Sequence, residues 1–128
     1  MQHTSRGKMS AAAERAAERR LRDDEAPRLK TMVPLLTSLK LEIEDRGAIG
    51  TVKHMRHVMV DRASTVFLIP CGDKACNSEG HDITSYVMRA LSQRREQFEG
   101  DHTCEGTVGS ANCTRVIVYR AQAKYNTV

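Results

Sequence analysis

The sequence predicts an α+β domain in which an N-terminal helical arm precedes a mainly antiparallel, twisted sheet with one helix packed on one face. Segments with the apolar patterns of strands fall on both sides of one amphipathic helical segment, which gives the order β-β-β-α-β-β. The connections between neighbouring strands are short, and short connections favour antiparallel pairing. A chain of 128 residues with 40% hydrophobic residues is long enough for one such domain.

Residues 1–33 form a charged, Ala-rich arm that is predicted to be helical or partly disordered, and residues 34–128 form the predicted single α+β domain with a Cys-rich end. The segment 11–21 is rich in Ala, Arg and Glu, which have high helix propensity, and Ser10 is a suitable N-cap. Because Leu21 is its one large apolar residue, this helix buries too little surface to dock firmly. We expect either an isolated helix or a partner-binding arm that orders on contact.

Three strands are predicted between residues 39 and 69. The first has apolar and charged residues in alternation, as in a strand with one solvated face, and its apolar positions are Leu39, Leu41 and Ile43. The stretch 51–60 is rich in β-branched and Met residues and predicts a second strand. Residues 65–69 form a continuous apolar run before Pro70, which predicts a central strand covered on both faces.

The predicted helix spans residues 82–99, with Asp82 as its cap and Gly100 as its end. Its apolar residues recur at helical spacing, and Phe98 extends this stripe. Two strands are predicted next, at 102–107 and 113–125. Alternate residues of the second strand share one face, namely Ile117, Tyr119, Ala121, Ala123 and Tyr125.

The four cysteines are clustered in two pairs, and each pair lies in or around a predicted loop. We expect the end of the third strand to converge with the final hairpin, which brings the four thiols to one point. Such an arrangement allows a tetrahedral Zn²⁺ to join distant parts of a small domain. Two nearby histidines can each replace one thiolate in a Cys3His set. The predicted zinc ligands are therefore Cys71, Cys76, Cys104 and Cys113, with His81 and His102 as candidates.

The spacing of these cysteines leaves other interpretations open. Four residues lie between the cysteines of the first pair and eight between those of the second, whereas paired zinc ligands typically have two residues between them. One or two disulfides are possible in an oxidising compartment, and free cysteines also serve as small buried hydrophobic residues. Redox or nucleophilic chemistry is the fourth alternative, although a Cys-x-x-Cys at a helix start is absent.

The chain carries a net charge of +4, and most of the excess lies in residues 1–30, with eight basic and five acidic residues. A basic arm attracts phosphate, and a second basic cluster lies on the second predicted strand. A solvated arm and a strand edge protected by charge are the alternative interpretations. The candidate nucleic-acid-binding residues are Arg15, Arg19, Arg20, Arg22, Lys53 and Arg56.

These observations favour a small non-enzymatic binding domain with a structural zinc site. Its predicted partner is a nucleic acid or a protein, including a second copy of the chain that binds through the arm or an edge strand. The alternative is a thiol- or metal-dependent enzyme that uses Cys71, Cys76 and His81. No apolar run approaches the roughly 20 residues of a membrane span, and no secretory signal is recognisable, so we expect a cytoplasmic protein without membrane contact.

Overall fold

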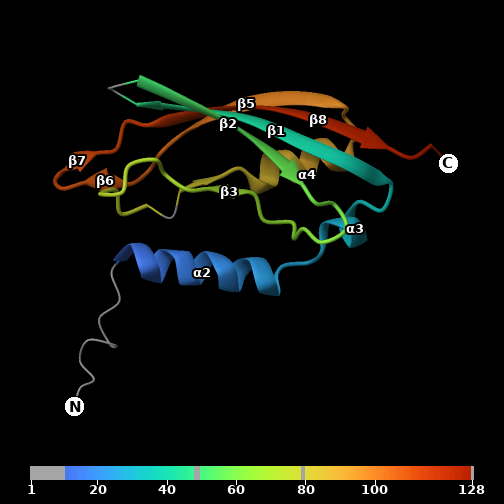
Figure 1. Cartoon of the computed structure of the whole chain (residues 1–128), viewed down its shortest axis with the longest axis horizontal. Coiled ribbons are helices and arrows are strands. Elements are labelled where there is room, and N and C mark those ends of the chain that lie inside the picture. The colour runs from blue at the N-terminus through green and yellow to red at the C-terminus, as the bar shows by residue number, and fades with distance from the viewer. Residues whose placement is uncertain (1–10, 48–49, 79, 128) are drawn as a thin grey trace, which may run out of the picture.

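The main element of the fold is a four-stranded antiparallel sheet with the strand order β2-β1-β8-β5. A computed structural model describes residues 11–47, 50–78 and 80–127. The strands of the sheet are β1 (Leu36–Gly47), β2 (Gly50–Val58), β5 (Gln97–Thr103) and β8 (Val116–Tyr125). With one helix packed on one face of the sheet, the predicted α+β class is confirmed (Figure 1).

Burial on the two central strands follows the alternation in the sequence. Leu39, Leu41 and Ile43 of β1 are at most 2% exposed, whereas the residues between them are half-buried or exposed. Ile43 lies opposite Tyr119 of β8, whose alternate residues are also buried. The two strands therefore share one apolar face, as their period-2 pattern predicted.

The inner face of the sheet is covered by α4 (Thr84–Ser92), which buries Val87, Ala90 and Leu91. The predicted cap at Asp82 was wrong, because Asp82 lies in β4 and the N-cap position is Ile83. The Asp82 carboxylate nevertheless accepts the N–H of Thr84 at 3.1 Å. The helix is shorter than predicted because the chain turns at Arg94, which has a φ of 56°. Phe98 enters the same core from β5, and its helical spacing from Leu91 is a coincidence.

The prediction of a central third strand was wrong. Only Leu68–Ile69 form a strand, β3, and it pairs with β4 (His81–Asp82) in a separate two-stranded ribbon. Phe67 and Ile69 are nevertheless buried in the core beneath the sheet, and Leu68 is buried where it borders the groove beside α2. A continuous apolar run thus indicates burial on both sides of the chain. Here tertiary packing buries the segment although it is not a central strand of the sheet.

The final hairpin also differs from its prediction. The strand expected at 102–107 is β5, which ends at Thr103, and β8 begins at Val116 instead of residue 113. The segment between them contains a small ribbon of β6 (Thr107–Val108) and β7 (Ala111–Asn112). The two cysteines of this segment therefore lie outside the main sheet, in the loops that flank the ribbon.

The arm contains α2 (Ala11–Glu25) and the short helix α3 (Leu29–Met32). Figure 1 shows α2 on the side of the molecule away from the four-stranded sheet, next to β3 and the cysteine loops. Polar contacts hold it there, since Arg22 forms an ion pair with Asp82 at 3.0 Å and Ser64 donates a hydrogen bond to Asp23. The predicted Ser10 cap lies outside the described residues. In the described part of the chain, no helix meets the length and apolarity that a membrane crossing requires.

Candidate metal centre

The first pair of cysteines lies in the loop that follows β3. Asp73 organises this loop, because its carbonyl accepts the N–H of Cys76 at 3.1 Å and its carboxylate accepts the N–H of Ala75 at 2.9 Å. The N–H of Ser78 then points to the sulfur of Cys76 at 3.4 Å. These contacts turn the chain back on itself and direct its thiols toward one end of the ribbon.

The second pair lies on either side of the β6-β7 ribbon. The N–H of Cys104 donates to the carbonyl of Arg115 at 2.9 Å, and the N–H of Cys113 donates to the carbonyl of Gly106 at 2.8 Å. Both bonds continue the antiparallel pairing beyond the ends of the named strands. Gly109 has a φ of 63° in the turn of the ribbon, a conformation that favours glycine.

Asn77 and Thr107 join the two cysteine loops. The N–H of Asn77 donates to the carbonyl of Thr107 at 3.0 Å, and the side-chain oxygen of Asn77 accepts the N–H of Thr107 at 2.8 Å. Gly106 allows this close approach, since a Cβ atom there would lie 2.6 Å from the sulfur of Cys76. The loops are therefore held in contact by groups other than the thiols themselves.

The four sulfur atoms meet at this junction. All four lie within 4.8 Å of one another, with Cys71 and Cys113 separated by 3.8 Å and Cys76 and Cys104 by 3.6 Å. Cys76, Cys104 and Cys113 are buried, Cys71 is half-buried, and none is in a disulfide. The convergence of the two pairs that the sequence predicted is thus present, and the cluster is able to hold a metal ion.

The surroundings of the thiols affect their ionisation unequally. Burial raises the pKa of Cys71 and of Cys76 above the usual value for a thiol. Burial acts in the same direction on Cys104, but hydrogen bonds from the backbone of Gly106 and from the side chain of Ser78 outweigh it and lower its pKa. A bound cation stabilises thiolates, so it offsets the cost of ionising buried sulfur.

The two candidate histidines lie against each other. The Nδ1 atoms of His81 and His102 are 2.9 Å apart, and their rings meet edge to face with centroids 5.1 Å apart. His81 is fully buried, and burial followed by the nearby His102 lowers its pKa, which favours a neutral ring. Within the described residues, the group that is able to hold a metal ion consists of the four cysteines, and no hydrogen bond joins His81 to Cys71 or Cys76.

An ion pair behind the centre was not anticipated from the sequence. Arg115 Nε lies 3.0 Å from Asp45 Oδ1, which connects the segment after Cys113 to β1. Gly72 lies against this pair, because a Cβ atom at that position would come within 2.8 Å of the Arg115 guanidinium. The sequence held one signal for this contact, namely the position of Arg115 two residues after Cys113 and of Gly72 directly after Cys71.

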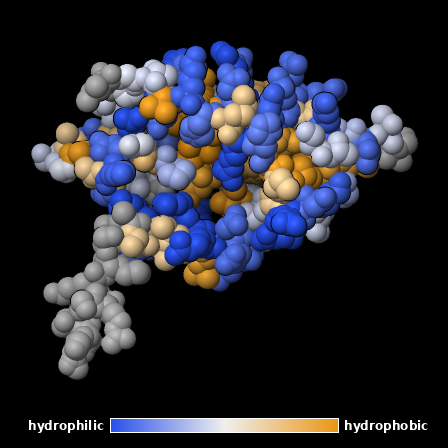
Figure 2. Space-filling view, viewed as in Figure 1, coloured by the Kyte–Doolittle hydropathy of each residue, from blue (hydrophilic) through white to orange (hydrophobic). Residues whose placement is uncertain are grey.

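Four of the six candidate nucleic-acid-binding residues line one groove between α2 and the rest of the domain. Arg19, Arg20 and Arg56 border a cavity of about 530 Å³ together with Val66 and Leu68. Arg15 and Arg19 border an adjoining cavity of about 250 Å³. Figure 2 shows hydrophobic residues in this hollow with hydrophilic side chains along its margins.

The other two candidates lie elsewhere. Arg22 forms the ion pair with Asp82. Lys53 lies on β2, opposite Glu44 of β1. Lys74 was not among the predicted binding residues, and it lines the smaller cavity together with Cys71 and Cys76. Asp23, Asp24 and Asp73 also border the groove, so its described residues carry a modest basic excess.

Comparison with known proteins adds no relative: no protein-family model, curated protein or solved structure matches this chain. The fold and the site together define a class, a small α+β domain with a cluster of four cysteines beside its sheet.

Proposed function

We propose that this chain is a small non-enzymatic binding domain whose cysteine cluster is a structural zinc site. One observation carries the proposal, namely the four sulfurs within 4.8 Å of one another. Four sulfurs that each lie about 2.3 Å from a central Zn²⁺ are about 3.8 Å apart in a tetrahedron. The separations of 3.6 and 3.8 Å between the sulfurs agree with that geometry.

The ligand set supports a structural role for the metal. Four thiolates complete a tetrahedral shell, whereas a catalytic zinc retains an open position for water or substrate. Three of the four cysteines are buried, and the shell is supported by the Ser78 N–H and by the contact between Asn77 and Thr107. Soft thiolate ligands in tetrahedral geometry favour zinc over magnesium or calcium.

Metal removal tests this proposal. Treatment of the reduced protein with a zinc chelator is expected to lower its free energy of unfolding by several kcal/mol, because metal binding is coupled to folding of the two loops. Addition of one equivalent of Zn²⁺ should restore the original urea denaturation curve. An identical denaturation curve with and without the chelator, at a confirmed loss of metal, contradicts a structural role.

We further propose that the groove between α2 and the domain binds single-stranded nucleic acid. The specific support is that Arg19, Arg20 and Arg56 border the groove without an ion pair to any carboxylate within residues 11–47, 50–78 and 80–127. Cationic grooves follow the phosphate backbone of single strands. The domain has no tryptophan and few aromatic residues, so binding is expected to depend on phosphate rather than on base stacking.

Salt-dependent binding of a 5′-labelled oligonucleotide of about 12 nucleotides tests this second proposal. The double variant Arg20→Gln/Arg56→Gln should bind about 10-fold more weakly at low salt and with a shallower salt dependence. The matched control is Arg46→Gln/Arg120→Gln, which removes the same charge from exposed ion pairs on the strands. Equal losses in both variants, or no binding by the native protein, refute the groove and favour a protein partner.

A further inference from the structure

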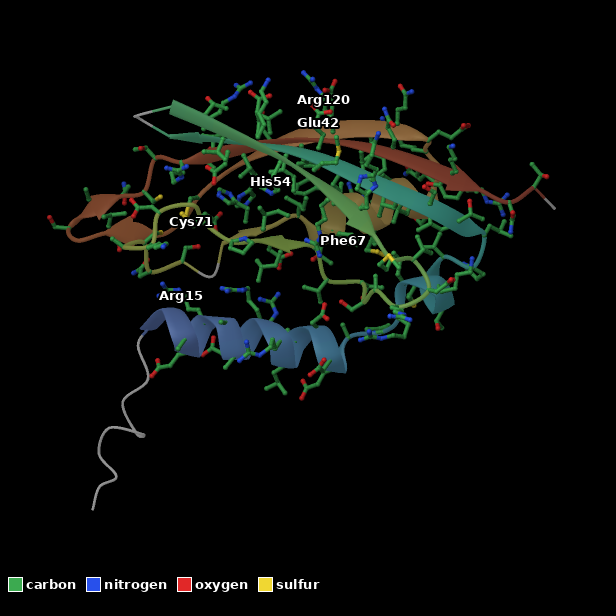
Figure 3. The ribbon with its side chains drawn as sticks, in the orientation of Figure 1. Arg15, Glu42, His54, Phe67, Cys71 and Arg120 are labelled. Carbon is green, nitrogen blue, oxygen red and sulfur yellow. The ribbon has the colours of Figure 1, made fainter. Side chains whose placement is uncertain are left out.

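The N-terminal half of α2 lies over the cysteine loop that follows β3. Arg15 and Arg19 border the cavity of about 250 Å³ that also contacts Cys71 and Cys76. They are four residues apart, so both side chains lie on one face of the helix. Figure 3 shows Arg15 on the side of α2 that faces Cys71.

Within the described part of the chain, these two arginines have no ion-pair partner. Both side chains are half-buried, yet neither forms an ion pair or side-chain hydrogen bond with any residue of the described segments. Lys74 adds a third cation to the same cavity. Among the described residues, the carboxylate of Asp73 also borders it, and that carboxylate accepts the N–H of Ala75 within its own loop. The described residues that line the cavity therefore carry an excess of positive charge next to the sulfurs.

A zinc ion held by four thiolates would give the centre the negative charge that these cations lack as a partner. Four thiolates around one Zn²⁺ leave a net charge of about minus two, and the thiol protons go to solvent on binding. Cys71 is the least buried of the four ligands, and it is one of the two that border the cavity with the arginines. Negative charge at this point attracts Arg15, Arg19 and Lys74, and the partly buried location limits screening by water.

The remaining attachment of α2 is weak enough for this attraction to matter. No described side chain of α2 is buried, and Leu21 is 57% exposed. Its contacts through Arg22 and Asp23 lie in the C-terminal half of the helix. The N-terminal half faces the cysteine loop through Arg15 and Arg19, which border the shared cavity.

We propose that Arg15 and Arg19 are positioning residues that compensate the charge of the metal centre, so that α2 docks more tightly when the metal is bound. This inference rests on the proposed zinc site. Linkage requires the effect to be reciprocal, because docking of α2 then strengthens metal binding by the same factor. Helix α2 becomes the part of the chain that responds to loss of the metal.

Zinc affinity of the full, reduced chain tests the inference by competition with a chromophoric chelator. The variant Arg15→Gln/Arg19→Gln should bind Zn²⁺ about 10-fold more weakly at low salt, and the difference should shrink at high salt. Its matched control is Arg46→Gln/Arg120→Gln, which removes the same charge from exposed ion pairs on β1 and β8 at positions that do not border the cysteine cavity, and which should keep native affinity.

A change in the charge of the centre itself provides a second readout. Cys71→His keeps four zinc ligands while it removes one negative charge, so the arginine substitutions should lower affinity about 3-fold in this background instead of about 10-fold. Equal zinc affinities of the native protein and the Arg15/Arg19 variant overturn the charge compensation and leave the zinc site intact. Absence of zinc binding by the native protein would instead refute the zinc site.

Discussion

Replacement of Cys104 by serine is expected to remove the metal and unfold the cysteine-rich end of the domain. Cys104 is 4% exposed, and its sulfur lies 3.6 Å from that of Cys76 at the junction of the two loops. A serine hydroxyl is a poor zinc ligand, and even changes outside the ligand shell lower metal affinity 10- to 100-fold. We therefore expect a loss of zinc affinity of at least about 100-fold, measured by chelator competition.

The same variant should lose several kcal/mol of unfolding free energy in urea titrations, because metal binding stabilises the folded loops. The control is Glu105→Ser, an exposed neighbour on the same loop, which should retain native metal affinity and stability. Native zinc content and native stability in Cys104→Ser would show that this thiol is a buried hydrophobic group and no ligand.

Replacement of Phe67 by alanine should destabilise the domain by about 3–5 kcal/mol. Phe67 is 1% exposed and is the largest of the fully buried side chains. Its N–H donates to the Thr84 hydroxyl at 2.8 Å and its carbonyl accepts the N–H of Ile83 at 2.9 Å, so it joins β3 to the start of α4. This loss is a large fraction of the roughly 5–15 kcal/mol by which a domain is stable.

Urea denaturation followed by circular dichroism measures this loss. Tyr86→Ala is a matched control, since Tyr86 is an aromatic residue of α4 that is 60% exposed and should change stability by about 0.5 kcal/mol at most. Equal destabilisation of the two variants contradicts the placement of Phe67 in the core.

The sheet was predictable where sequence period reports burial directly. Alternation at Leu39, Leu41 and Ile43 gave the buried face of β1, and alternation from Ile117 onward gave that of β8. The third strand was mispredicted because a continuous apolar run does not distinguish a central strand from a short ribbon packed in the core. The end of the helix was mispredicted because Phe98 continues the helical period although its chain has already turned at Arg94.

The candidate site was predictable in part. Two thiol pairs on separate loops indicated a common point, and the structure places the sulfurs together. The pairing of His81 with His102 depends on β4 and β5, whose exact positions the sequence pattern does not define. The groove also depends on the docking of α2, which polar contacts such as Arg22 with Asp82 achieve without an apolar face. Helical periodicity alone carries no signal for such docking.

The most direct test of the central claim is the metal content of the full chain, purified without chelator and measured by elemental analysis alongside thiol titration in denaturant. We predict about one zinc per chain together with four reactive thiols. Protein without metal that also fails to take up added Zn²⁺ would contradict the claim, as would a chain with fewer than four free thiols before reduction.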